Sequence, residues 1–329
     1  MNKAVLLVIF NRYYNAKLVL DKIRRVKPPR LYIAADGPRK NNKDDIINCN
    51  KSREIIKEVD WECNIKTLFR EENMQCGPSV SEAITWAFEY EEDLIILEDD
   101  CIPEDAFFYF CENLLNYYKN NEKIMSICSG GSYNNKGYDY YFLSCSGTWG
   151  WATWKRAWKY FNFNIENLYS EELIYEKLRN AYDDNNVINF WMDMYKKTYQ
   201  GNFKCCWSYQ WHFSVLANNG LCVFSNDNFI VNIGTPECVK NPKRIKELLN
   251  NRKYHDIPKN FTHPEIKRSK YVDYIASIEG INSYMMEKFN KKNVDSIHGI
   301  IETIIWFVPF RFLRNKLRDF FRKKVPLYE

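Results

Sequence analysis

The order of apolar and polar positions in the first hundred residues predicts alternating strands and helices. Continuous apolar runs occur in AVLLVIF at 4–10 and in DLIILEDD at 93–100, and such runs are typical of strands covered on both faces. The segments RLYIAADG and NIKTLFRE predict two further strands. Repeated strand–helix units favour an α/β fold, with a mostly parallel, Rossmann-like central sheet flanked by helices.

Helical spacing or capping residues predict the elements between these strands. The predicted helices are 16–26, 52–61 with Ser52 as N-cap, 79–92 with Ser79 or Ser81 as N-cap, and one that begins at Pro103. Further along, the pattern predicts a strand, a loop and a strand over 126–144, an aromatic loop leading into a helix over 147–161, and a helical region over 170–200.

A change of composition predicts a domain boundary. From about 235 to 270 the chain turns polar, basic and proline-rich, which indicates a domain at 1–238 and a helical C-terminal extension at 239–329. Phe310, Leu313, Leu317, Phe320 and Phe321 share one face of a predicted basic amphipathic helix at about 309–325. This helix could dock on an anionic membrane surface or pack on its own domain.

The net charge of +5 is concentrated in this tail. Residues 311–324 hold seven basic residues and one acid, a net +6, so the rest of the chain sums to −1. A neutral body with a basic appendage argues against nucleic acid as a partner. The eleven cysteines form no C-x-x-C pair, which favours free thiols in a reducing cytosol. We therefore expect a cytoplasmic protein, with peripheral attachment to the inner face of the cytoplasmic membrane through the final helix.

Three adjacent acids, Glu98, Asp99 and Asp100, follow the predicted strand at 94–97. Adjacent carboxylates repel, so a positive partner is expected there. Asn11-Arg12 and Asp36-Gly37 follow two other strands, and such strand ends meet at one edge of an α/β sheet. Mg²⁺ or Mn²⁺ bound with a diphosphate would explain the acids. The alternative is an acidic first turn of the next helix.

With these motifs the chain resembles the GT-A glycosyltransferases, which use nucleotide-diphospho-sugars, over roughly residues 4–235. It is similar to bacterial surface-polysaccharide transferases and, more distantly, to the N-acetylglucosaminyltransferase I type. The matching segments are LVIFNR, YIAADGPR, FREENMQCGPSVSEAITWAFE, IILEDDCIPEDAFFYFCENLL, WGWATWKRAWKYF, WSYQW and NDNFIVNIG. EDD stands here as a variant of the family's aspartate-x-aspartate motif.

The resemblance implies roles for individual residues. Asp100, with Asp99, would hold the metal ion, and Glu98 with Asp99 would contact the donor's ribose and sugar. Further donor-binding positions are Asn11, Arg12, Asp36, Gly37, Arg70, Asn73, Ser79, Asn232 and Gly234, with Arg39 a second candidate for phosphate. Trp149, Gly150, Trp151 and Tyr209 would form a wall for sugar. Each also has a structural alternative, such as a turn, a helix cap, a surface charge or a core ring.

The catalytic base is where the chain departs from the family. An acid commonly follows the tryptophan that Trp207 matches, and here Ser208 follows it. Asp193, or the pair Asp183-Asp184, could serve instead. The relatives' downstream histidine is also missing, and His212 and His255 are the nearby substitutes.

The expected function is metal-dependent transfer of a sugar from a nucleotide donor, most commonly a UDP-sugar, to a glycan or lipid-linked glycan in surface polysaccharide synthesis. Inversion at the anomeric carbon is expected. The alternatives are an inactive sugar- or nucleotide-binding descendant, and a sugar-nucleotide nucleotidyltransferase. The second is disfavoured because FNRYYNAK lacks the glycines of that class.

Overall fold

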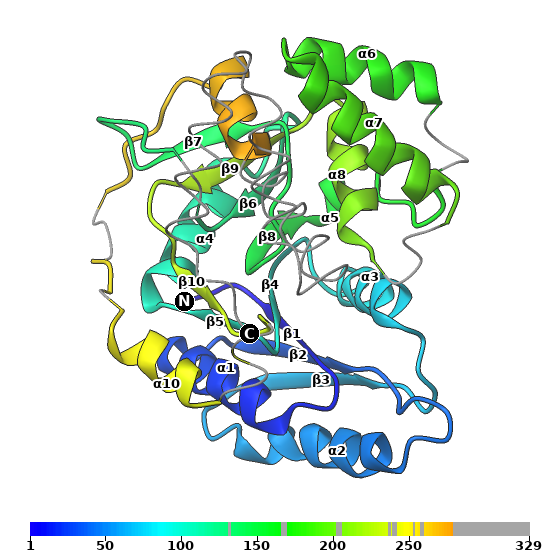
Figure 1. Cartoon of the computed structure of the whole chain (residues 1–329). Helices are drawn as coiled ribbons and strands as arrows, with labels where there is room; N and C mark the ends of the chain where they lie inside the picture. Colours follow the sequence, from blue (N-terminus) through cyan, green and yellow to red (C-terminus); the bar gives the residue numbers. More distant parts are fainter. Residues whose placement is uncertain are drawn as a thin grey trace, which may run out of the picture. The chain divides into compact units, whose positions relative to one another are not determined.

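The computed structural model describes residues 1–130, 133–165, 170–201, 206–235, 238, 242–252, 254–256 and 260–278 (Figure 1). Its centre is an eight-stranded sheet. In spatial order the strands are β3 (Asn64–Phe69), β2 (Arg30–Ala35), β1 (Val5–Ile9), β4 (Asp93–Glu98), β8 (Trp151–Trp154), β6 (Ile124–Cys128), β9 (Leu221–Ser225) and β7 (Tyr140–Leu143). A separate antiparallel ribbon pairs β5 (Cys101–Pro103) with β10 (Ile230–Asn232).

The sheet is mixed and mostly parallel, which confirms the predicted fold class. Strands β3, β2, β1 and β4 are parallel neighbours. Strand β8 runs against β4 and β6, whereas β6 and β9 run in the direction of the first four, and β7 is again reversed. The four strands predicted in the first hundred residues are all present.

Helices cover both faces of the sheet, as the all-apolar strands require. In β1, Val5, Leu7 and Ile9 belong to one buried cluster, and Leu6 and Val8 belong to the other. The first cluster takes residues from α1 (Tyr13–Val26), α4 (Asp105–Tyr117) and α10 (Pro242–Asn250). The second takes residues from α3 (Cys76–Ala87), α5 (Lys155–Trp158) and α8 (Ser208–Ala217).

Two other helices, α6 (Glu171–Ala181) and α7 (Asn185–Tyr199), confirm the predicted helical region; α8 contacts both. The remaining helix, α2 (Lys43–Arg53), precedes a 3₁₀ turn at Glu54–Glu58.

Four predicted details were wrong. Helix α3 begins at Cys76 with Gln75 at the N-cap position, so Ser79 and Ser81 lie inside the helix and neither caps it. Helix α2 begins at Lys43, where the Asn42 side chain accepts the Asp45 N–H as the N-cap, so Ser52 lies inside the helix and caps nothing. Pro103 belongs to β5, which pairs with β10, and α4 begins only at Asp105. The segment 151–154, predicted as loop and helix, is strand β8, because it fills the place between β4 and β6 in the sheet.

The chain divides into two compact units, Met1–Ala276 and Ser277–Glu329. Within the first unit, segments after residue 238 pack on the sheet domain, for example through Asp273, which accepts hydrogen bonds from Ser144 N and Oγ at 2.7 and 2.9 Å. The boundary at 238 stays a prediction, and the basic helix at about 309–325 lies outside the described residues. Among the described helices, none has the length and apolar character needed to cross a membrane.

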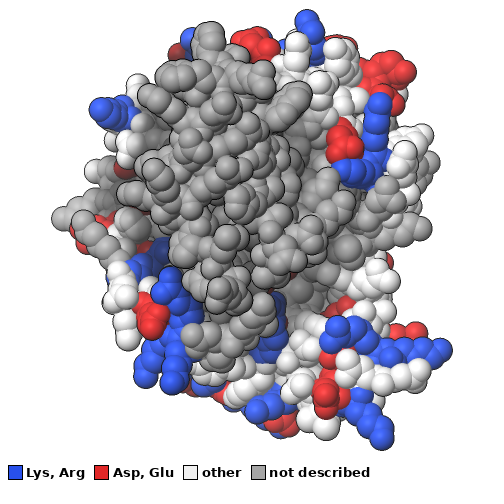
Figure 2. Space-filling model, in the orientation of Figure 1, with Lys and Arg blue, Asp and Glu red and all other residues white. Residues whose placement is uncertain are grey.

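Cysteine state and surface charge agree with two expectations from composition. The ten cysteines in the described part of the chain are all free thiols. On the described surface visible in Figure 2, basic and acidic side chains lie near one another.

Candidate functional site

Strand register places the three predicted polar segments at one sheet edge. Ile9 pairs with Ala35 and Val8 pairs with Glu98, so the residues that follow β1, β2 and β4 leave the sheet side by side. Strand β8 is antiparallel to β4, with Ile96 opposite Trp151, so the start of β8 reaches the same edge. This carboxyl edge is where open α/β sheets bind ligands.

Arg12 supplies the positive partner that the acids require. Its Nη2 donates to Asp99 Oδ1 and also to Asp100 Oδ2, at 3.1 Å from the second. The other oxygen of Asp99 accepts the Phe10 N–H at 3.3 Å. Asp99 is almost fully buried, whereas the Asp100 side chain remains 19 % exposed. Asp99 is therefore held by the protein itself, and Asp100 is the acid that faces outward.

Crowding of charge in this cluster shifts the proton affinities of its members. Burial, together with Asp100 and Asp99, raises the pKa of Glu98 to about 8. Burial also raises the pKa of Asp99, although Arg12 opposes that shift. For Arg12, burial lowers the pKa, but Asp99 and Asp100 outweigh it and the pKa rises. At neutral pH Glu98 thus tends to carry a proton and can donate a hydrogen bond.

A second group of predicted donor-binding residues lies where β2 ends. Asp36 is buried and accepts hydrogen bonds from Asn73 Nδ2 at 2.9 Å and from Met74 N at 3.0 Å. Burial raises the pKa of Asp36, while the N–H groups of Met74 and Gly37 oppose the rise. A Cβ at Gly37 would overlap the backbone of Glu72, so only glycine allows this close approach.

Ser79 and Arg70 also lie near Asp36. Ser79 is buried in the first turn of α3, where its side chain lowers the pKa of Asp36 by hydrogen bonding. Arg70 follows β3 and its charge lowers the same pKa. Its guanidinium pairs with Glu82 of α3 at 3.1 Å. The structure therefore brings four predicted donor residues, Asp36, Asn73, Ser79 and Arg70, to one place.

Asn11 and Arg39 are engaged elsewhere. Both donate to Asp45, the Asn11 amide at 2.7 Å and Arg39 Nη2 at 2.8 Å. The pair with Arg39 lowers the pKa of Asp45 to about 2. These contacts tie the end of β1 to α2, and in this arrangement they give both side chains a structural partner.

The ribbon of β5 and β10 brings residues 232–234 to the acids. Asn232 pairs with Cys101, and the Ile233 N–H donates to the backbone oxygen of Asp100 at 2.8 Å. A Cβ at Gly234 would overlap Asp100 Oδ2. The predicted neighbourhood of Asn232, Gly234 and the acidic triplet is therefore present.

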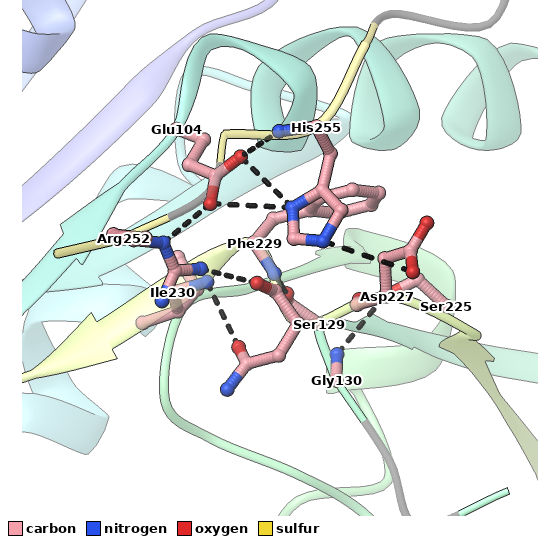
Figure 3. Close-up of polar contacts among 10 residues, drawn as sticks. Glu104, Ser129, Gly130, Ser225, Asp227, Phe229, Ile230, Arg252 and His255 are labelled. Atoms are coloured by element: carbon pink, nitrogen blue, oxygen red, sulfur yellow. Dashed lines mark hydrogen bonds and ion pairs between the residues drawn. The ribbon is translucent and has the colours of Figure 1, made fainter.

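Sequence reasoning missed Glu104, which anchors the ribbon of β5 and β10. It is 3 % exposed and accepts hydrogen bonds from Arg252 Nε and from His255 N at 2.9 Å (Figure 3). His255 Nδ1 lies 3.1 Å from its carboxylate, and Asp227 lies on the other side of the ring, 3.7 Å from Nε2. The Glu104 N–H donates to Phe229 O at 2.9 Å. Its position just before a helix was the signal in the sequence that could have found it.

The predicted sugar wall divides into an exposed ring and a core ring. Trp149 is 65 % exposed, whereas Trp151 is 1 % exposed and stacks on Trp207 with centroids 5.5 Å apart. Gly150 between them has φ +67°, and a Cβ there would meet Ile230 of β10. Tyr209 lies half-buried in the first turn of α8. Trp149 is thus the tryptophan of this segment whose ring can meet a ligand.

The candidate bases lie on the α6–α7–α8 side. Asp184 caps α7, and Asp193 pairs with Lys197 one turn along that helix. Asp183 pairs with Lys270 at 2.6 Å. Ser208 begins α8, with its Oγ 3.0 Å from Cys206 Sγ. No base is assigned from these contacts.

Two expectations from the sequence remain, namely His212 as a substitute histidine and a metal site. His212 is buried against Trp191, and burial lowers the pKa of its imidazole to about 3. Among the described residues, no group of three or more His, Cys, Asp and Glu is arranged as a metal cluster. Hard carboxylate oxygens still suit Mg²⁺ or Mn²⁺. Both acids have partners in the structure, since Arg12 also donates to Asp100 Oδ2 and Cys101 Sγ lies 3.4 Å from Asp100 Oδ1. Asp100 is the more exposed of the two and is therefore the more accessible candidate ligand.

Comparisons with known proteins give low-similarity structural matches. No family model and no curated protein matches the chain. Residues 1–349 of S. aureus TarS match with 9% identity and a TM-score of 0.40, over 70% of this chain and 60% of that one, so this chain spans about three fifths of it. A 4-diphosphocytidyl-2C-methyl-D-erythritol synthase from Anaerococcus prevotii matches with 13% identity and a TM-score of 0.39, over 74% and 96%.

A UDP-glucose pyrophosphorylase complexed with UDP-glucose matches with 11% identity and a TM-score of 0.38, over 75% of this chain and 100% of that one. The TarS fragment has also been solved with UDP-GlcNAc. The matched structures thus include a synthase and a pyrophosphorylase beside TarS, and two of them are known with a uridine diphosphate sugar.

Proposed function

We propose that the chain is a metal-dependent glycosyltransferase that takes its sugar from a nucleotide-diphospho-sugar, with a uridine diphosphate sugar as the first donor to test. The observation that carries the proposal is the position of Asp100. It is the outward-facing acid at the carboxyl edge of β4, with Gly234 in contact with its carboxylate. The hydrogen-bonded pair of Asp36 and Asn73 follows β2 along the same edge.

Each part of this edge suits a part of the donor. Asp36 can accept a hydrogen bond from a base. The Asn73 amide nitrogen already donates to Asp36 and to Gly37 O, so its oxygen is the atom it offers to a ligand. The first turn of α3 presents backbone N–H groups to phosphate. Trp149 offers an exposed ring to a sugar face.

Asp100 would hold Mg²⁺ or Mn²⁺, which supplies positive charge for the departing diphosphate. Arg12 opposes the burial that raises the pKa of Asp99, and it fixes the edge of the site. Glu98 can donate a hydrogen bond to the donor when it is protonated. We propose a glycan or lipid-linked glycan as acceptor, on the cytoplasmic side of a membrane, and leave the catalytic base unassigned.

The competing function is nucleotidyl transfer on a similar sheet. Calorimetry of a panel of nucleoside diphosphates with and without Mn²⁺, on the wild type and on Asp100→Ala, tests the site. We expect metal-dependent binding of one nucleotide that is lost in the variant. Lack of binding by every nucleotide would refute the proposal. Incubation of the preferred UDP-sugar with Mn²⁺ and pyrophosphate then separates the two reactions, because a nucleotidyltransferase forms UTP and a sugar phosphate.

A further inference from the structure

The described residues that line a pocket beside α7 and α8 carry no charge. The pocket has a volume of about 410 Å³. Its walls include two aromatic rings, three amides and a hydroxyl: Phe163, Tyr199, Asn164, Gln200, Gln210 and Thr198. Three other pockets in the described part of the chain each include charged residues, such as Lys119, Arg25 and Arg244. Amides, hydroxyls and ring faces without charge suit a neutral, hydroxyl-rich ligand.

Gln210 gives a second indication that this pocket takes a polar ligand. It is 3 % exposed, and its Oε1 has no hydrogen-bond partner among the residues that the structure describes. A buried amide oxygen without a partner costs free energy, so such groups mark places where a ligand or water is held. Tyr199 on the opposite wall is 48 % exposed and offers its ring to a ligand entering from solvent.

The pocket is connected to the candidate site through α8. Trp151, at the start of β8, stacks on Trp207, which immediately precedes α8. Helix α8 therefore begins beside the sheet edge that carries the acids, and Gln210 lies in its first turn.

We propose that the pocket between α7 and α8 binds a neutral saccharide. Its rings would pack on Tyr199 and Phe163, and its hydroxyls would bond the amides. As the acceptor for transfer, this saccharide rests on the proposed function; as a bound ligand it does not. An acidic sugar is disfavoured because the lining residues that the structure describes offer it no cation.

Ligand-observed saturation-transfer NMR on the full chain tests the proposal. The probes are the methyl glycosides of glucose, galactose, mannose and N-acetylglucosamine, and glucuronic acid as the anionic counterpart. At least one neutral glycoside should show a saturation-transfer signal, and the signal of glucuronic acid should be at least fivefold weaker. Tyr199→Ala and the near-isosteric Gln210→Leu should each lower the signal at least fivefold. Tyr175→Ala, which removes a comparably exposed ring from α6, should leave it unchanged.

The outcomes separate this inference from the proposed function. The proposed saccharide site is wrong if no neutral glycoside shows a saturation-transfer signal. It is also wrong if the signal persists in both Tyr199→Ala and Gln210→Leu. Nucleotide binding by Gln210→Leu, measured by calorimetry, should equal that of the wild type. If glycosides bind in the pocket but no nucleotide binds to the chain, the saccharide site is supported and the proposed transferase function is refuted. Tyr199→Ala keeps the test valid if Gln210→Leu fails to fold, because the Tyr199 side chain is half exposed.

Discussion

Arg12 and Asp100 face each other across the mouth of the candidate site, with Arg12 Nη2 3.1 Å from Asp100 Oδ2. The same nitrogen also donates to Asp99, the more deeply buried acid. One guanidinium therefore neutralises the buried carboxylate and borders the exposed one. A change at Arg12 should consequently affect both the stability of the fold and the binding of a donor.

Arg12→Met should lower the free energy of unfolding by about 1–3 kcal/mol, because it leaves Asp99 buried without a charged partner. The lower part of that range is expected, since Arg12 is more than a third exposed. Urea unfolding at neutral pH measures the effect. The control is Arg25→Met, which removes an exposed pair with Asp105 and should cost less than about 1 kcal/mol. Equal losses in both variants would contradict the role given to Arg12.

Glu98 should make the fold less stable as the pH rises. Its pKa is about 8 in the folded chain and 4.5 ordinarily, so between these values the folded state binds more proton than the unfolded state. The free energy of unfolding then falls with pH, by at most about 1.4 kcal/mol per unit. Glu98→Gln stays neutral and should lack this contribution. Urea midpoints at pH 5, 6.5 and 8, with chelator, should therefore decline more steeply for wild type than for the variant; parallel declines would show that Glu98 ionises normally.

Glu104→Gln should loosen the segment around 252–256. The change removes the charge that holds Arg252 and His255, and a buried charged hydrogen-bond partner left unsatisfied costs about 1–3 kcal/mol. Hydrogen exchange should accelerate in 254–256 and in β10, because Arg252, which Glu104 holds, also donates to Asn228 O just before β10. Asp105→Asn, on the exposed neighbouring pair with Arg25, is the matched control. Unchanged protection in β10 would show that the ribbon does not depend on Glu104.

Gly234→Ala should weaken nucleotide binding at least about tenfold, equivalent to about 1.4 kcal/mol. The new methyl group would occupy the space of Asp100 Oδ2 and would turn that carboxylate away from its position. Calorimetry with the preferred nucleotide and Mn²⁺ is the measurement. Thr235→Ala, one residue along and exposed, should bind like wild type. Wild-type affinity in Gly234→Ala would remove Asp100 from the binding site.

The parts of the fold that the sequence predicted are those that depend on local pattern. Strand β1 is apolar on both faces, and this pattern alone implies helices on both sides of the sheet. Convergence of Arg12, Asp36 and the acidic triplet followed from the same reasoning, because parallel strands end together. The family resemblance gave Asp36 and Asn73 separate donor-binding roles, and their contact with each other was not predicted.

What the sequence could not predict depends on partners distant in the chain. Trp149 and Trp151 stand in the same short tryptophan-rich segment, yet the burial of Trp151 depends on Trp207, which lies 56 positions further on. Glu104 was given no role from the sequence, and only the fold brings Arg252 and His255 to it. Helix α2 was misplaced because the Asn42 cap lies in a polar segment without helical periodicity.

The unequal exposure of the two tryptophans around Gly150 also has an optical consequence. Trp151, Trp158, Trp207 and Trp211 form a buried group of stacked and tilted rings, shielded from solvent. Trp149 is exposed to solvent, and it lies at the sheet edge that carries the acids. Collisional quenchers such as iodide reach this fluorophore and not the buried four, so the chain carries a native reporter of whatever occupies that edge.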